Sequence, residues 1–528
     1  MDRNLRRLTL LTLSILLIIG TVIRFVYLYH FSETVFFNPF LMDRHDQKTF
    51  ILWAKQIQQH PWYVDGKPFY MAPFYPYFLA LLLTLTGENL VAVLALQLLL
   101  DVLVCFLLFL IGCQIADERT GLIAAGLACF YRTFIVYSGT VLSDGIITLL
   151  YTVFIAMALL AQEKHKFWPK MAAGVTLGLA ALAKPTIALF LPFLFLGLIS
   201  LRGGRGKSKG ESHSEKLLPQ KVKVPSRSYQ AGLKTFLVIS VFCVLVILPV
   251  TVRNFWVSGR FIPICTNGPV NWAIGNSADS LGLFCYPQGP LLSVWSARFW
   301  KLQLTKAMLF FTSYEWPQNL NVYLLEEIIP SLRLAFVHFG LVVPVGLAGL
   351  VVVFFDWRRK FLFLTYTLTN IAWVIFFFIT DRYRLPAVAC LMVSAGYFFV
   401  WTYDHLKTNW KAILGLWSAV LLFAYFFNTV PGPRIPNIYV KILAALTKKN
   451  VPYDLACGKL KKAYREAETL ARLQPENPDA HFLLACVLEQ AGQREEAVRA
   501  LQRTLKLDPH FENARKFLKT LVPDGVDN

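Results

Sequence analysis

Runs of about 20 apolar residues recur along most of this chain, and they limit its possible folds more than any other feature. A helix needs about 20 mostly apolar residues to cross the hydrocarbon core of a bilayer. Hydrophobic residues make up 56% of the 528 residues and charged residues only 16%. The runs predict an all-α, polytopic membrane helix bundle with about 11 spans, near residues 8–28, 90–113, 122–137, 145–160, 172–182, 187–201, 235–251, 334–355, 361–379, 386–401 and 413–427.

Basic residues in the loops between these runs predict how the bundle is oriented. Cytoplasmic loops of membrane proteins carry an excess of Lys and Arg. The basic clusters fall on one side when the N-terminus is cytoplasmic, above all in the loop 202–234. The outer face then holds a first loop, 29–88, and a large loop, 252–332. Residues 73–85 are apolar but short, so we expect a helix in the membrane interface there.

The net charge of +20 indicates that the protein contacts a negatively charged partner or surface. A strongly basic chain can indicate nucleic acid. Here the basic loops flank apolar runs, which favours the headgroups of anionic membrane lipids, and we expect no nucleic-acid partner. The nine cysteines form no metal-binding motif, and a disulfide between Cys265 and Cys285 in the large outer loop is left open.

A repeat follows the last span. The segment that begins Leu473-Gln-Pro recurs as Leu507-Asp-Pro, a spacing of 34 residues, which is the period of a tetratricopeptide repeat. Gly492 permits the turn between the two helices, and Pro509 ends the second helix. We therefore expect a membrane domain over 1–430, a linker over 431–450 and a tetratricopeptide domain over 451–528. A plain helical hairpin is the alternative.

Acidic residues of the outer face are candidates for chemistry. Asp43 and Asp46 lie in the first loop, where a carboxylate near a low dielectric can act as a base or simply solvate the loop. Asp144 opens the apolar run 145–160, where it can cap the helix or carry function. Asp101 lies inside a span with no obvious charge partner in the sequence, so we expect a packing role.

Basic residues also occur on the outer face, where few are expected. Arg382, Tyr383 and Arg384 join two spans, and Lys184 and Arg253 lie at the outer ends of others. Guanidinium groups form paired hydrogen bonds to phosphate. Each cation alone could be an interfacial anchor, but together they predict an anionic ligand such as a lipid-linked phosphate.

Five segments in this order resemble a known family. They are the first loop with Asp46, Trp53-Ala54 and Ala72-Pro-Phe-Tyr-Pro76, then Leu142-Ser-Asp144, then the segment ending Lys184-Pro-Thr186, then Val252-Arg-Asn254 with the following Ser258–Gly268, and finally Arg382-Tyr-Arg-Leu-Pro386. This pattern resembles the GT-C superfamily of membrane glycosyltransferases. The nearest group is glycosyltransferase family 39, which contains protein O-mannosyltransferases and aminoarabinose transferases. The resemblance covers roughly residues 8–400.

The resemblance implies sugar transfer from a polyprenyl-phosphate donor on the extracytoplasmic side. It implies that Asp46 is the catalytic base or a metal-linked carboxylate, and that Asp144 is the second acidic residue. Gln47 stands where many relatives carry glutamate, which leaves the use of Mg²⁺ or Mn²⁺ open. We predict that Arg382, Arg384, Lys184 and Arg253 bind the donor phosphate, and that the pocket includes His45, Tyr75, Tyr383 and Asn254.

The predicted function is inverting transfer to a protein, lipid or glycan of the cell envelope, with no cofactor beyond a candidate divalent cation. The predicted location is the bacterial inner membrane, with the repeat domain outside, where it could bind a protein partner or a polypeptide acceptor. Two alternatives remain. A flippase or transporter of lipid-linked sugars is the first, although the chain lacks the internal repeats typical of transporters. A polysaccharide polymerase or ligase is the second.

Overall fold

The computed structural model describes residues 3–41, 46–62, 66–163, 166–199, 229–428 and 435–522. The described residues form helices with three isolated β-bridges between loops. They divide into two compact units. Unit 1 comprises Met1–Arg24, Phe50–Gln318 and Ala335–Thr429, and unit 2 comprises Phe25–Thr49, Asn319–Leu334 and Val430–Asn528. The basic loop predicted at 202–234 falls almost wholly outside the described residues, as does the first part of the predicted linker.

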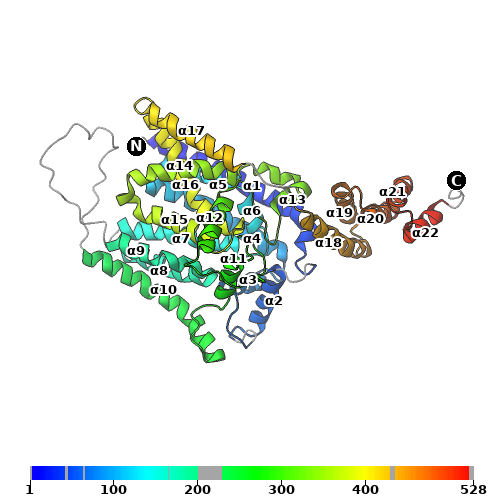
Figure 1. Cartoon of the computed structure of the whole chain (residues 1–528), viewed down its shortest axis with the longest axis horizontal. Coiled ribbons are helices and arrows are strands. Elements are labelled where there is room, and N and C mark those ends of the chain that lie inside the picture. The colour runs from blue at the N-terminus through cyan, green and yellow to red at the C-terminus, as the bar shows by residue number, and fades with distance from the viewer. Residues whose placement is uncertain are drawn as a thin grey trace. The chain divides into compact units, whose positions relative to one another are not determined.

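Figure 1 labels the α-helices that precede the C-terminal repeat, and the predicted apolar runs lie within some of them. Their bounds are α1 Arg3–Ser32, α2 Asp46–Gln59, α3 Phe74–Leu85, α4 Leu90–Ile115, α5 Glu118–Cys129, α6 Arg132–Ser138, α7 Asp144–Glu163, α8 Phe167–Ala183, α9 Leu191–Ile199, α10 Tyr229–Ser258, α11 Gly268–Asn276, α12 Ala297–Phe311, α13 Val322–Ile328, α14 Phe339–Phe355, α15 Trp357–Phe376, α16 Leu385–His405 and α17 Trp410–Phe427. Short 3-10 helices cover η1 Val35–Phe37, η2 Pro185–Phe190, η4 Pro330–Leu334 and η5 Arg382–Arg384.

Six of the described helices are long and apolar enough to cross a membrane, namely α1, α4, α7, α10, α16 and α17. The chain is therefore a multi-pass integral membrane protein with an all-α fold, as the sequence predicts. The other predicted spans form shorter or more polar helices. The run at 187–201 begins with η2 and continues as the short α9, and α3 has the 12 residues of the expected interfacial helix.

The run at 122–137 is broken into α5 and α6 by the main chain of another segment. Arg132 N donates to Val337 O at 3.1 Å, and Val337 N donates to Phe130 O at 3.0 Å. These two bonds engage backbone groups beside the helix break and bring residue 337 against α5 and α6. No proline or glycine marks the break in the sequence, because the competing partner lies about 200 positions away along the chain.

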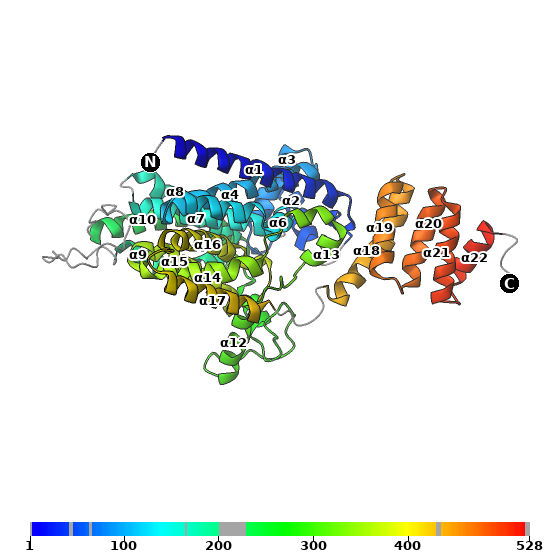
Figure 2. The ribbon, with the colours of Figure 1, turned by 90° about the horizontal axis from the view of Figure 1, so that it is seen from above.

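Small residues bring neighbouring helices of unit 1 close together. Figure 2 shows α7, α8, α15 and α16 running alongside one another. Where α4 meets α5, a β-carbon built on Gly112 would lie 2.5 Å from the α-carbon of Gly121. A β-carbon on Gly349 of α14 would lie 2.0 Å from Ser394 O of α16. Larger side chains would therefore force these backbones apart, as in other membrane helix pairs.

A buried ion pair joins α1 to α4. Arg24 Nη2 lies 2.7 Å from Asp101 Oδ2, and the two residues are 0% and 2% exposed. Arg24 Nη1 also donates to the main-chain oxygens of Gly20 and Cys129, each at 3.0 Å. The expectation that Asp101 has no charge partner is wrong. The partner is the arginine that interrupts the first apolar run.

The C-terminal part of unit 2 is a row of antiparallel helices (Figure 2). They are α18 Asn437–Ala456, α19 Leu460–Leu473, α20 Pro478–Gln490, α21 Arg494–Leu507 and α22 Glu512–Leu521. Alanines 463, 467, 485 and 497 are fully buried between them, and their small side chains let the helices approach. Gly492 has φ +75°, the left-handed conformation that the turn between α20 and α21 requires. These contacts are those expected of a tetratricopeptide repeat.

Candidate functional site

Asp144 and Arg382 meet at the helix ends of unit 1. Asp144 is the first residue of α7, and Arg382 lies in η5, just before α16. Arg382 Nη1 lies 3.4 Å from Asp144 Oδ2, and Arg382 Nε donates to Gln318 Oε1 at 3.1 Å. The two charged residues are 3% and 6% exposed. The fold therefore pairs two sequence-predicted site residues that are 238 positions apart.

Lys184 completes this group, which we name the Arg382 cluster and define as Asp144, Lys184, Arg382 and Tyr383. Lys184 Nζ lies 3.1 Å from the centre of the Tyr383 ring and 4.3 Å from that of Trp373. Burial lowers the pKa of Lys184 well below its usual value, while the charge of Asp144 opposes this shift. A lysine held on two aromatic faces keeps its ammonium directed without a salt bridge.

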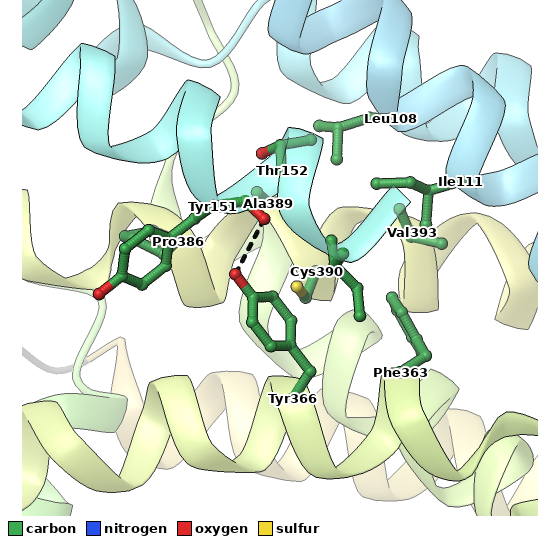
Figure 3. A pocket seen from close by; sticks show the side chains of 11 residues that line it. Leu108, Ile111, Tyr151, Thr152, Phe363, Tyr366, Pro386, Ala389, Cys390 and Val393 are labelled. Carbon is green, nitrogen blue, oxygen red and sulfur yellow. Dashed lines mark hydrogen bonds between the residues drawn. The ribbon is translucent and has the colours of Figure 1, made fainter. Parts of the chain in front are cut away.

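Tyrosines beneath the cluster hold Lys184 in place. Lys184 O accepts a hydrogen bond from the hydroxyl of Tyr151 at 3.1 Å. Figure 3 shows the hydroxyl of Tyr366 reaching across to α7, where it donates to Tyr151 O at 2.9 Å. The surrounding side chains from α4, α7, α15 and α16 are mostly apolar. The turn between α8 and η2 therefore rests on a closely packed apolar layer.

Two buried carboxyl groups lie close to the cluster. Asp381 Oδ1 accepts from the hydroxyl of Tyr137 and from Arg382 N, both at 2.7 Å. Glu315 Oε1 accepts from Thr133 Oγ1 at 3.0 Å. Burial raises the pKa of both carboxyls, and for Asp381 the neighbouring Glu315 raises it further. The sequence analysis did not identify Glu315, Tyr137 or Gln318, because no local motif distinguishes them.

Arg384 and Arg253 bind main-chain oxygens. Arg384 is 0% exposed and donates to Leu309 O at 2.7 Å and to Tyr314 O at 2.9 Å. Arg253 donates to Lys67 O at 2.5 Å and to Trp62 O at 3.3 Å. Both guanidinium groups hold loops in place, so the structure does not bring them into the Arg382 cluster.

Two predicted pocket residues likewise make internal hydrogen bonds in unit 1. Asn254 Nδ2 donates to Ile262 O at 3.1 Å and to Ile264 O at 2.9 Å, which closes the turn after α10. Tyr75 is 1% exposed, and its hydroxyl donates to Gln97 Oε1 at 2.9 Å. Both side chains fix the shape of the outer loops.

Asp46 belongs to unit 2, where it begins α2. Its Oδ2 accepts a hydrogen bond from Asn319 Nδ2 at 2.8 Å, and the side chain is partly exposed. The predicted pocket residue His45 precedes it and lies outside the described residues, as does Asp43. Asn319 is a further residue that the sequence analysis did not identify.

The acidic residues of the described segments do not gather in a metal-binding arrangement. No group of three His, Cys, Asp or Glu side chains comes together within these segments. Asp144 already faces a guanidinium group, and Asp46 accepts an amide hydrogen. The cysteines Cys265 and Cys285 are both free thiols, and Cys265 Sγ donates to Asn267 Oδ1 at 3.3 Å.

Comparison with protein families supports the resemblance that the motifs indicate. The family model for dolichyl-phosphate-mannose-protein mannosyltransferase matches residues 67–210, and a tetratricopeptide-repeat model matches residues 455–526. The first match includes Asp144 and Lys184. The predicted similarity to this glycosyltransferase group and the predicted C-terminal repeat are therefore confirmed.

Solved structures that match include two membrane proteins. One is the oligosaccharyltransferase AglB from Archaeoglobus fulgidus, in complex with an inhibitory peptide and a dolichol-phosphate. The sequence identity is 14% and the TM-score is 0.44, and the match covers 85% of this chain and 58% of that chain. The other is ArnT from Cupriavidus metallidurans bound to undecaprenyl phosphate, with 13% identity, 92% and 79% covered, and a TM-score of 0.42. This chain thus spans little more than half the length of the archaeal protein. No curated protein matches the sequence.

Proposed function

We propose that this protein is an integral membrane glycosyltransferase that moves a sugar from a polyprenyl-phosphate carrier to an acceptor outside the cytoplasm. The observation that supports this most is the Arg382 cluster. Two of its members, Asp144 and Lys184, lie in the segment that matches the mannosyltransferase family model, and Arg382 packs against Asp144 from a distant part of the chain. The guanidinium of Arg382 and the amine of Lys184 are donor groups of the kind that bind a phosphate.

In the proposed reaction Asp46 takes the proton of an acceptor hydroxyl, which typically contributes about a hundred- to ten-thousand-fold to the rate. The oxygen attacks the anomeric carbon of the donor, and a new glycosidic bond forms with inversion. The bond between that carbon and the phosphate oxygen breaks, and its electron pair leaves with the polyprenyl phosphate. Arg382 and Lys184 stabilise the charge that develops on this phosphate.

Asp144 positions Arg382 in this mechanism. Its carboxylate lies 3.4 Å from the guanidinium, farther than in a tight ion pair, so Arg382 can turn toward a bound phosphate while still facing Asp144. Arg253 and Arg384 act indirectly in this mechanism. Each binds main-chain oxygens and so holds a loop near the site in shape. We predict that a divalent cation, Mg²⁺ or Mn²⁺, if one is used, would bind at Asp46 and Asp144. In the structure Asp46 accepts a hydrogen bond from Asn319 and Asp144 faces Arg382, so the steps above use only side chains of the protein.

The proposed location is the bacterial inner membrane, with the N-terminus in the cytoplasm and the site and repeat domain outside. Polyprenyl carriers present their sugars at the outer surface, where the first loop and η5 are expected to lie. The division into a membrane domain at 1–430, a linker at 431–450 and a repeat domain at 451–528 remains part of this proposal. The repeat domain would bind a polypeptide, as acceptor or partner.

The test is sugar transfer by the purified protein with a radiolabelled polyprenyl-phosphate sugar and an extract of envelope acceptors. We expect a labelled product with the parent protein and about 10²- to 10⁴-fold less with Asp46→Asn, since the base is lost. Glu88→Gln is the matched control, because Glu88 is an exposed carboxylate next to α3. Full activity of Asp46→Asn would contradict the proposal. Lipid movement across vesicles without a new glycosidic bond would favour the flippase instead.

A further inference from the structure

Asn319 holds the carboxylate of Asp46 in an arrangement that requires an unusual backbone. Its Nδ2 donates to Asp46 Oδ2 at 2.8 Å. Its φ is +68°, in the left-handed region that few residues other than glycine and asparagine adopt readily. Only two described non-glycine residues have such a positive φ. The conformation therefore coincides with the contact to the proposed base.

Asn319 is the first residue of a short segment, which we name the strap and define as residues 319–334. The strap contains α13 and η4. Asn321 caps α13 by accepting from Leu324 N at 2.8 Å, and Ile329 N donates to Leu325 O at 2.7 Å. Val322, Leu324 and Leu325 are buried. The strap is thus an ordered element within unit 2.

The middle of the strap is bound to the tetratricopeptide helices. Arg472, in the last turn of α19, donates to Glu327 O at 3.0 Å and lies 3.5 Å from Glu327 Oε2. Arg333 of the strap also lies 3.5 Å from the carboxylate of Glu327. One glutamate therefore links the strap to the repeat domain with both its main chain and its side chain.

The segment that carries Asp46 is fastened to the same helices. Arg465 of α19 lies 3.5 Å from Glu33, and α18 packs against η1. Ser331 Oγ of the strap contacts His30 Nδ1 at 3.0 Å. The strap, the segment 25–49 and the repeat helices therefore form one compact unit.

We propose that Asn319 is a positioning residue for Asp46, and that the strap couples the repeat domain to this carboxylate. The inference rests on the proposed function of Asp46 as base. The amide donor holds the carboxylate in one orientation, which is the orientation that the proposed base requires. Because α19 holds the strap, a polypeptide bound to the repeat helices changes how firmly the base is held.

A positioning role and a purely structural role give different results. Without the Asn319 amide, Asp46 loses the contact that holds its carboxylate, so kcat falls while the KM for the donor stays the same. A purely structural asparagine would lower the amount of folded protein but would leave the kcat of the folded fraction unchanged.

The experiment compares Asn319→Gly, which keeps the positive φ and removes the amide, with Asn319→Asp, which keeps the shape and replaces the donor with a carboxylate. We expect kcat to fall about 10- to 100-fold in both, the size typical of lost supporting hydrogen bonds. The KM for the donor should stay within about twofold, because the amide contacts the base and not the phosphate site.

An unchanged kcat in folded Asn319→Asp would overturn the inference. This variant decides the test if Asn319→Gly does not accumulate as folded protein. The coupling is tested by Arg472→Ala, for which we expect a kcat about two- to fivefold lower, since exposed ion pairs are weak. Arg499→Ala, an exposed arginine of α21, is the matched control and should leave kcat unchanged. Equal kcat in the two arginine variants would overturn the coupling.

These outcomes separate the inference from the proposed function. If Asp46→Asn keeps full activity, the assignment of the base fails and the role of Asn319 fails with it. If Asp46→Asn is inactive while both Asn319 variants match the parent, the base is correct and only the positioning role is lost.

Discussion

Two buried arginine–aspartate pairs in unit 1 have the same two residue types but differ in geometry and surroundings. In the pair of Arg24 and Asp101, the charged atoms lie 2.7 Å apart and the arginine is fully buried between α1 and α4. In the pair of Arg382 and Asp144, they lie 3.4 Å apart at helix ends, and the amine of Lys184 lies on the ring of the adjacent Tyr383. The first pair is a tight ion pair, whereas the second is looser and has a further donor group beside it.

The difference separates a structural pair from a binding site. The guanidinium of Arg24 also donates to Gly20 O and Cys129 O, so its hydrogens are directed inward and no ligand is needed. The Arg382 cluster has a looser ion pair and a lysine that rests on aromatic rings without a salt bridge in the described residues. A phosphate would accept hydrogen bonds from these two groups, and this is why we propose the donor site at the second pair.

The largest expected effect is on stability, at the first pair. Arg24→Ala leaves the charge of Asp101 buried without its partner, which typically costs about 3–5 kcal/mol. Thermal unfolding of the purified protein in detergent measures this loss. The double variant Arg24→Met with Asp101→Leu is the control, and it should recover most of the stability. If Arg24→Ala unfolds at the parent temperature, the pair is not a structural clamp.

The next effect is on turnover, at the second pair. Arg382→Ala should lower kcat by about 10²- to 10³-fold, the usual loss when a donor that stabilises transition-state charge is removed. The pair of Arg382 and Asp144 is the looser of the two, so the melting temperature should fall less than in Arg24→Ala. Arg260→Ala, an exposed arginine after α10, is the control. A larger loss of stability than of turnover would reverse the roles that we assign to the two pairs.

Another buried carboxylate, Glu466 of α19, has an amide as its partner, whereas the aspartates of the two pairs have a guanidinium. Asn450 Nδ2 donates to both its oxygens at 2.9 Å. Burial raises the pKa of Glu466 to about 7, from 4.5. The folded state therefore keeps a proton that the unfolded chain releases, and stability is present at low pH and lost as the pH rises through 7.

We expect the unfolding free energy of unit 2 to fall by about 2–3 kcal/mol between pH 5 and pH 7. Hydrogen exchange of the full protein with peptide-level mass spectrometry, at a series of pH values and corrected for intrinsic exchange rates, follows the helices of the repeat domain separately. Glu466→Gln should remove this dependence, while Glu468→Gln, on the same helix, should keep it. A pH dependence that survives Glu466→Gln would assign it to another group.

Much of the fold could be predicted from the sequence because apolar length and a 34-residue period are local signals. The spans at α1, α4, α7 and α16 and the repeat around Gly492 follow from such signals. The break between α5 and α6 could not be predicted, because its cause is the main chain of Val337, far along the sequence. Asp101 was misjudged for the same reason, since its partner Arg24 is 77 positions away.

Part of the candidate site could also be predicted from the sequence. Asp144, Lys184 and Arg382 stand out as charges at the ends of apolar runs, and the fold brings them together. Arg253 and Arg384 carry the same sequence signal, yet they bind main-chain oxygens, which only the tertiary structure shows. Asn319 gives no signal, because an amide that supports a carboxylate has no spacing of its own in the sequence.

The central claim is that the Arg382 cluster binds the phosphate of a lipid-linked sugar donor. The most direct measurement is binding of a fluorescent short-chain polyprenyl phosphate to the purified parent protein, Arg382→Ala, Lys184→Ala and Arg24→Met with Asp101→Leu. We predict that the two cluster variants bind at least tenfold more weakly and that the double variant binds like the parent. Equal affinity in all four proteins would contradict the assignment of the donor to the cluster.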